Sequence, residues 1–245
     1  MKRRTVLSGL AAAASTLAIR PLRADKTAAP SCRMITQDLT GPYYLDARQF
    51  RSDIADGQPG VPLQLEFEVV DTFTCQPLPG AAVHLWHNNA QGLYSGVNNL
   101  VLDADLNPVG SGIDLTDSSF LRGVQTTNEQ GRVRFVTIMP GWYAPRPTHV
   151  HLKVYPPTFG EVATTQLYFP PTFCDEVYKH EAYAARGPTP IRDDHTTPSR
   201  DSASNDESLW ITPVRSGAGY QHSMQLGVTF YGQNFGDLDD FYRQG

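Results

Sequence analysis

The chain has 245 residues, of which 40% are hydrophobic and 18% are charged, and its formal net charge at pH 7 is −5. This acidic balance, with no basic cluster beyond the first few residues, argues against a nucleic acid or an anionic membrane surface as the partner. A small soluble substrate is favoured instead. The length is enough for one domain with a sizeable core, and no internal repeat divides it.

Residues 1–24 have the pattern of a signal peptide. Arg3 and Arg4 precede an alanine-rich apolar run over residues 10–19, and residues 22–24 fit a cleavage site. The adjacent arginines favour the twin-arginine route, with an ordinary Sec signal as the alternative because no serine precedes them. The apolar run is shorter than the roughly 20 residues that span a bilayer. We expect an exported protein, periplasmic or secreted, whose mature form has no membrane span.

The rest of the chain divides into an N-terminal segment, residues 25–38, which we expect to be flexible, and one domain over residues 39–245. Apolar and polar residues alternate over residues 63–69, which is the period of a half-buried strand. Further strand-like runs lie at residues 81–86, 132–138 and 224–230. Many short strands with turn signals predict an all-β protein, an antiparallel β-sandwich with long loops and at most a short helix, at residues 175–186.

Two long segments lack a strand pattern, residues 98–119 and residues 187–207. Segments of this length without secondary structure of their own are usually functional or mobile. The first could form a wall of a binding site. The alternative, given equal weight, is a loop that lies on the surface away from any site.

Three cysteines, Cys32, Cys75 and Cys174, allow one disulfide and one free thiol in an oxidising compartment. Spacing alone does not define the pairing. We expect Cys75 to pair with Cys174, because Cys32 lies in the flexible N-terminal segment.

The run from Pro140 to His151 carries the chemistry of a metal site. His149 and His151 are two apart in an alternating strand, so both rings leave one face, with their α-carbons about 7 Å apart. A His-x-His pair alone also occurs on ordinary strand surfaces. Tyr143 shortly before the pair, and Tyr94 after an earlier strand-like run, add two further donors.

Together these segments resemble the intradiol ring-cleavage dioxygenases, whose non-haem ferric iron is held by two tyrosines and two histidines. The resemblance is strongest from about residue 41 to residue 169. Six segments carry it in order: Gly41-Pro42-Tyr43-Tyr44, Leu85-Trp86 to Gly92-x-Tyr94, Phe120-Leu121-Arg122-Gly123, Thr137-Ile138-x-Pro140-Gly141-x-Tyr143, Arg146-x-x-His149-x-His151 and Thr164-Thr165-Gln166-Leu167-Tyr168-Phe169.

The resemblance implies the role of each site residue. The four positions that match the iron ligands are Tyr94, Tyr143, His149 and His151. Arg146 matches the active-site arginine, and Gln166 matches the glutamine that follows the second histidine by fifteen residues. The chain departs from short exported members of the family at Asn88, where cysteine is common, and at Pro145, where glycine is common. These departures affect loop shape and the pocket rather than the ligand set.

The chemistry of this ligand set favours Fe(III). A tyrosine hydroxyl has a pKa near 10, so binding it as phenolate at pH 7 costs about 4 kcal/mol per residue. A strongly Lewis-acidic ion offsets this cost, whereas zinc prefers Cys, His and carboxylate, and calcium prefers carboxylates and carbonyls. Two phenolates and two neutral imidazoles around a trivalent ion leave a net charge of +1, which attracts a catecholate.

The resemblance thus implies an Fe(III) dioxygenase that cleaves a catechol between its two hydroxylated carbons. Both atoms of O2 enter a muconate-type product, Tyr143 leaves the metal when the catechol binds, and Arg146 stabilises negative charge on the ring. The identity of the catechol and the oligomeric state stay open. Two alternatives are a non-catalytic transthyretin-like binding module and an exported zinc- or copper-binding protein that uses His149, His151 and His87.

Other aromatic and histidine residues have simpler interpretations. His84 is expected to be a polar or packing residue. His87 either supports a ligand or is a hydrogen-bonded core histidine. Trp142 is expected to pack and to line the pocket, and pocket lining rather than ligation is expected for Tyr43 and Tyr44.

Overall fold

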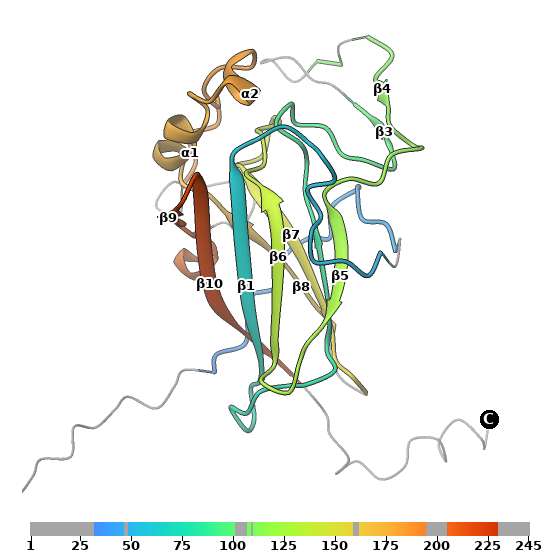
Figure 1. The fold of residues 1–245 in the computed structure, drawn as a ribbon, viewed down its shortest axis with the longest axis vertical. Coiled ribbons are helices and arrows are strands. Elements are labelled where there is room, and N and C mark those ends of the chain that lie inside the picture. Colours follow the sequence, from blue (N-terminus) through green and yellow to red (C-terminus); the bar gives the residue numbers. More distant parts are fainter. Residues whose placement is uncertain are drawn as a thin grey trace, which may run out of the picture. The chain divides into compact units, whose positions relative to one another are not determined.

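The computed structural model describes residues 32–46, 49–100, 107–108, 110–158, 162–194 and 205–229. The expected signal peptide lies outside these ranges. Two four-stranded sheets form the layers of a sandwich, with β10, β1 and β6 nearest the viewer and β7 and β8 behind them (Figure 1). The mostly β, two-sheet fold that the sequence predicts is therefore confirmed.

The first sheet has the strand order β6-β1-β10-β9 and the second has the order β5-β2-β7-β8. The strands of the first sheet are β1 (Pro62–Asp71), β6 (Arg132–Ile138), β9 (Val214–Ser216) and β10 (Gly219–Val228). Those of the second sheet are β2 (Ala82–Trp86), β5 (Arg122–Thr126), β7 (His149–Tyr155) and β8 (Ala163–Tyr168). One large hydrophobic cluster contains residues from both sheets.

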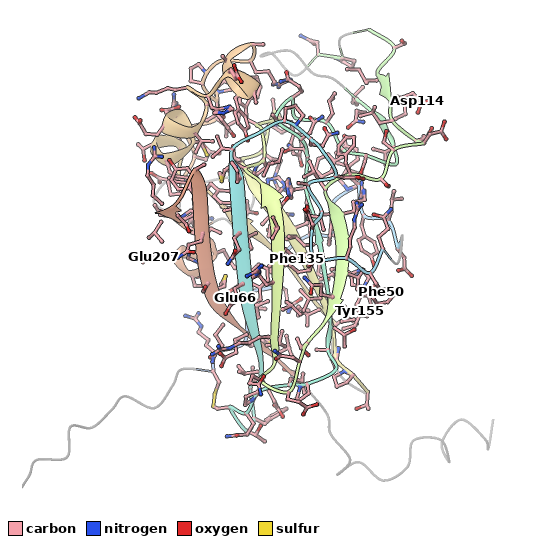
Figure 2. All side chains as sticks on the ribbon, viewed as in Figure 1. Phe50, Glu66, Asp114, Phe135, Tyr155 and Glu207 are labelled. Carbon is pink, nitrogen blue, oxygen red and sulfur yellow. A yellow bond between two sulfur atoms is a disulfide. The ribbon has the colours of Figure 1, made fainter. Side chains whose placement is uncertain are left out.

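Alternation along β1 explains how the layers form. Leu65 and Phe67 are completely buried, whereas Glu66 between them is only partly buried. Phe135 of the neighbouring strand β6 pairs with Leu65 and is also completely buried (Figure 2). Burying such side chains contributes about 1.5–3 kcal/mol each, so the alternation decides which face of the strand points inward.

The expected antiparallel arrangement holds for every strand pairing in the described residues except one. β1 and β10 pair in parallel, from Leu63 with Tyr220 to Asp71 with Val228. Parallel neighbours need a long connection, and nearly the whole domain lies between these two strands. Such a pairing is a long-range contact that the local strand pattern does not contain.

The helical content differs from the single short helix expected at residues 175–186. The described residues contain two short α-helices, α1 (Pro171–Val177) and α2 (Glu181–Ala184), and a 3₁₀ helix, η2 (Glu207–Leu209). α1 begins earlier than expected because Pro171 occupies its first turn. The N–H groups of the first turn have no partner within a helix, so the missing N–H of proline costs no hydrogen bond there. Within the described residues, no helix is long and apolar enough to cross a membrane.

The long segment over residues 98–119 contains a small sheet of its own. β3 (Asn98–Asn99) pairs with β4 (Ile113–Asp114), so part of this segment is ordered by backbone hydrogen bonds. Only residues 187–194 and 205–207 of the second long segment are described.

The expected disulfide pairing is wrong. Cys75 pairs with Cys32, with their α-carbons 5.3 Å apart, and Cys174 is a buried free thiol. The reason is that the N-terminal segment is not loose from residue 32 onward, because the N–H of Ile35 donates to the carbonyl of Gly227 at 2.9 Å. Cys174 instead packs into the core on the inner side of α1.

We expect removal of this disulfide, by Cys32→Ala with Cys75→Ala, to lower the free energy of unfolding by about 2–4 kcal/mol, because the bond closes a long loop in the unfolded chain. Urea denaturation would measure the change. Labelling of the unreduced, unfolded protein should modify Cys174 alone. A label on Cys32 would show that the pairing is different.

Candidate metal centre

β7 carries both members of the His-x-His pair. His149 and His151 stand on the face of β7 opposite Val150, whose side chain belongs to the hydrophobic core. The pair therefore lies on the outward face of the second sheet. In the register of the sheet, His151 is opposite Trp86 on one side and Gln166 on the other. Both rings are nevertheless almost completely buried, with 2% and 1% of their surfaces exposed.

Two tyrosines complete a cluster of donor atoms around the histidine pair. The Nε2 atoms of His149 and His151 are 3.1 Å apart. The hydroxyl of Tyr94 lies 3.1 Å from Nε2 of His151, and the hydroxyl of Tyr143 lies 3.3 Å from Nε2 of His149. Four atoms with lone pairs thus converge, and they come from the four residues that the sequence singles out as ligands.

Two glycines allow the segments that carry the tyrosines to approach each other. A Cβ atom on Gly92 would lie 2.4 Å from the carbonyl oxygen of Trp142, and one on Gly141 would lie 2.5 Å from that of Ala90. Gly92 also has a φ of +79°, which residues with a Cβ atom rarely adopt. A side chain at either position would push the two tyrosine segments apart.

Asn99 fixes the backbone of Tyr94, a role that sequence reasoning missed. The side-chain oxygen of Asn99 accepts from the N–H of Tyr94 at 2.7 Å, and its side-chain nitrogen donates to the carbonyl of Tyr94 at 2.8 Å. Asn99 is buried, so these bonds are sheltered from water. The side chain of Asn99 thus bonds both backbone groups of Tyr94, as a neighbouring strand would. In the sequence, only the position of Asn99 in the long segment over residues 98–119 pointed to such a role.

Each imidazole is held in one orientation. Nδ1 of His149 lies 2.6 Å from the carbonyl oxygen of Pro147, so the N–H is on Nδ1 and the lone pair is on Nε2. The ring of His151 stacks on Trp86 with centroids 4.8 Å apart and planes within 6°. Gly41 covers its other side, where a Cβ atom would lie 3.0 Å from Cε1 of His151. Both Nε2 atoms therefore face the donor cluster.

Burial controls the protonation of the cluster. It lowers the pKa of His149 to about 3, with a smaller contribution from the positive charge of Arg146. Burial and the neighbouring His149 ring lower the pKa of His151 well below its ordinary value. Burial and the neighbouring Tyr143 hydroxyl raise the pKa of Tyr94 well above its ordinary value. The site thus presents neutral imidazoles, and it accommodates phenolates only beside a strong cation.

The donor set fits a single metal ion. Two atoms that are 3.1–3.3 Å apart, and each about 2.1 Å from one ion, subtend about 95–105° at that ion, which coordination geometries allow. Among the described residues, no group of three or more His, Cys, Asp and Glu side chains could hold a metal. A metal at this place would have the two tyrosines and the two histidines as its protein donors. This set differs from the Cys, His and carboxylate ligands of zinc and from the carboxylates and carbonyls that bind calcium.

Arg146 and Gln166 form a hydrogen-bonded unit beside the cluster. Nη2 of Arg146 donates to Oε1 of Gln166 at 2.7 Å and to the hydroxyl of Tyr168 at 2.9 Å. The hydroxyl of Tyr168 donates to the carboxylate of Asp38, which lies 4.0 Å from Arg146. Nε2 of Gln166 donates to the carbonyl of Leu39 at 2.8 Å. The N-terminal segment thus helps to position the guanidinium.

His87 and His84 take no part in the cluster. Nδ1 of His87 is 2.7 Å from the carbonyl oxygen of Asn88, and Nε2 is 2.7 Å from the hydroxyl of Thr137. Both ring nitrogens are therefore engaged, and burial lowers the pKa of His87 to about 4. Of the two interpretations, the hydrogen-bonded core histidine is correct. His84 lies on the outward face of β2 in contact with Tyr44, as a packing residue.

A small pocket opens beside Tyr143. Its volume is about 20 Å³, enough for a water molecule, and its lining includes Tyr43, Asn99, Leu100, Tyr143 and Arg186. Part of the long segment over residues 98–119 therefore walls the pocket. The ring of Tyr43 stacks on that of Tyr94, with centroids 4.5 Å apart. Tyr94 is 1% exposed, so the pocket reaches the cluster from the side of Tyr143.

A family model described as "Dioxygenase" matches residues 39–187, a range that includes the whole donor cluster. Protocatechuate 3,4-dioxygenase beta chain from Burkholderia cepacia is 34% identical over 103 residues, which are 39% of each chain. Chlorocatechol 1,2-dioxygenase from Pseudomonas putida is 28% identical over 176 residues, which are 63% of this chain and 58% of that protein.

A solved structure, the intradiol ring-cleavage dioxygenase from Tetranychus urticae, superposes with a TM-score of 0.65 at 25% identity, covering 81% of this chain and 95% of that one. The chain spans less than two thirds of the length of the two curated relatives. The family match nevertheless covers more than half of the chain. The chain belongs to the intradiol ring-cleavage dioxygenase family.

Proposed function

We propose that this protein is an Fe(III)-dependent intradiol dioxygenase. It cleaves a catechol between the two hydroxylated carbons and inserts both atoms of O2 to give a muconate-type product. The observation that carries the proposal is the convergence of Tyr94, Tyr143, His149 and His151, whose donor atoms lie 3.1–3.3 Å from their neighbours in a buried site. The four residues would hold the iron, which supplies the Lewis acidity that binds a catecholate and makes its ring reactive toward O2.

The two tyrosines have different surroundings, which supports different roles. Tyr94 is almost completely buried, and Asn99 holds its backbone, so it is suited to remain a ligand throughout the reaction. Tyr143 is partly exposed and lines the pocket, so it is suited to leave when the substrate arrives. Its released phenolate oxygen then accepts a proton from a substrate hydroxyl.

Arg146 supplies a fixed positive charge beside the cluster. Its hydrogen bonds to Gln166 and Tyr168 set the orientation of the guanidinium before the substrate binds. A preorganised charge in a site with little water stabilises negative charge that develops on the catechol ring. Gln166 acts by holding the guanidinium through this bond.

The two alternatives are less well supported. A zinc or copper site with His149, His151 and His87 would require a free nitrogen on His87, and both of its nitrogens are hydrogen-bonded away from the cluster. A non-catalytic binding module has no need to bury four converging donor atoms, which costs free energy unless they bind something.

The central test is the metal content, colour and oxygen consumption of the protein. Tyrosinate bound to ferric iron absorbs broadly in the visible range, so we expect a red-brown protein with about one iron per chain that takes up O2 in the presence of catechols. Metal analysis, absorption spectra and an oxygen electrode with a panel of catechols would measure this. A colourless protein with a full complement of zinc would reject the proposal.

We also propose export by the twin-arginine route, which carries folded proteins and would let the site be loaded with metal before export. The support is the pair Arg3 and Arg4 ahead of the apolar run. Changing both to lysine should keep the precursor inside the cell, as measured by fractionation, because the receptor of this route reads the arginine pair. Normal export of the double variant would indicate the Sec route.

A further inference from the structure

Arg186 places a second guanidinium at the pocket beside Tyr143. It lies shortly after α2, and its side chain lines the pocket together with Tyr43 and Tyr143. Arg146, by contrast, is held within the cluster of Gln166 and Tyr168. The role proposed for the active-site arginine therefore does not explain Arg186.

The Arg186 side chain is held in place by neutral groups. Its Nη1 donates to the carbonyl of Gln91 at 2.9 Å, and its Nη2 donates to the carbonyl of Trp142 at 3.2 Å. Its Cζ atom lies 4.0 Å from the centre of the Trp142 ring, in a cation–π contact.

The charge of Arg186 has no carboxylate partner among the described residues. The ion pairs found among the described residues involve other cations: Arg51, Arg132, Arg146, Lys179 and Arg192. The Nε atom of Arg186 is buried and has no hydrogen-bond partner in the described structure. No Asp or Glu lines the pocket within these residues. Half-buried guanidinium groups remain charged, so the pocket is positive at this end.

We propose that Arg186 determines substrate specificity by binding an anionic substituent, such as a ring carboxylate, on the catechol. This inference rests on the proposed function. If the catechol oxygens lie where the Tyr143 hydroxyl now is, the ring takes the space that the departing Tyr143 phenol leaves, next to Arg186, since the pocket alone holds only about 20 Å³. A carboxylate there gains charge-assisted hydrogen bonds from a donor that has no anionic partner among the described residues, whereas an unsubstituted catechol leaves the guanidinium as it was.

The test is anaerobic binding to the iron-loaded protein, with catechol and 3,4-dihydroxybenzoate as the two ligands. We expect Arg186→Met to weaken binding of the carboxylated ligand by about 10- to 100-fold, the range for a hydrogen bond to a charged group. Binding of catechol should change by less than about threefold, and Arg186→Lys should recover part of the loss. Arg192→Met is the matched control, since Arg192 is an exposed arginine paired with Asp175, and it should alter neither ligand.

The outcomes separate this inference from the proposed function. Equal weakening of both ligands, or no weakening of either, would show that Arg186 only braces the Trp142 segment and would overturn the inference. Thermal unfolding of each variant reports whether the brace itself is lost. If the wild-type protein takes up O2 with catechols but Arg186→Met keeps the wild-type ligand preference, the proposed function stands. The specificity role of Arg186 is then rejected. Failure of every catechol to bind or to consume O2 would reject both.

Discussion

Tyr94→Phe is expected to lose most of its iron and with it the visible colour. Phenylalanine supplies neither a donor atom nor a negative charge, while the other three donors of the cluster remain. Loss of a residue that only supports a ligand typically lowers metal affinity 10- to 100-fold, so loss of a ligand should lower it by more than about 100-fold. Iron per protein after gel filtration, together with the absorption spectrum, would measure the effect.

Tyr143→Phe should behave differently, because Tyr143 faces the pocket and Tyr94 does not. We expect this variant to keep part of its iron, held by the other three residues, yet to lose turnover, since a proton acceptor is gone. Tyr43→Phe is the matched control. Tyr43 stacks on Tyr94 in the same aromatic cluster, and its ring would remain, so iron content should be unchanged. Full iron retention in Tyr94→Phe would contradict its role as a permanent ligand.

The strands and the directions of their side chains could be predicted from the sequence because they depend on the spacing of neighbouring residues. The alternation over residues 63–69 reports which side of β1 is buried, and the two-residue spacing of His149 and His151 reports that both rings leave one face of β7. The structure confirms the shared face. The two tyrosines were named by resemblance alone, since nothing in their local pattern states that residues 94 and 143 meet.

The features that escaped prediction are contacts between distant parts of the chain. The parallel pairing of β1 with β10 and the disulfide between Cys32 and Cys75 depend on where the chain returns after long excursions. The pairing of Cys75 was predicted wrongly because the N-terminal segment was treated as loose, whereas backbone hydrogen bonds anchor it on the domain. The role of Asn99 could not be predicted for a related reason. A side-chain amide that bonds to the backbone of another residue has no sequence pattern of its own.

The segment over residues 38–41, where the N-terminal segment joins the domain, connects the fold to the chemistry. Gly41 closes on the ring of His151, and the carbonyl of Leu39 accepts from Gln166, which in turn holds Arg146. The segment therefore covers the outward face of the sheet at the place where the donor atoms meet. This cover explains how a site on the outer face of a β-sandwich becomes almost as dry as its core, which strengthens every electrostatic interaction within it.

Arg146→Ala is expected to lower the turnover rate by about 10²- to 10³-fold, the usual cost of removing one preorganised stabilising group from a site with little water. Iron content and colour should stay near wild type, because Arg146 is not one of the four donors and its guanidinium donates to Gln166 and Tyr168. Steady-state oxygen uptake, expressed per bound iron, would measure the loss.

Two further variants separate charge from position at Arg146. Arg146→Lys keeps the charge but not the planar fork, so it should recover only part of the rate. Gln166→Leu keeps the charge and removes the group that orients it, so it should lower the rate less than Arg146→Ala does. Arg132→Ala, at an exposed ion pair with Glu68 on the other sheet, is the control and should leave the rate unchanged. If Arg146→Ala turned over normally with a full iron site, its charge would have no part in stabilising the substrate ring, and the rate enhancement would have to come from the metal centre and the tyrosines alone.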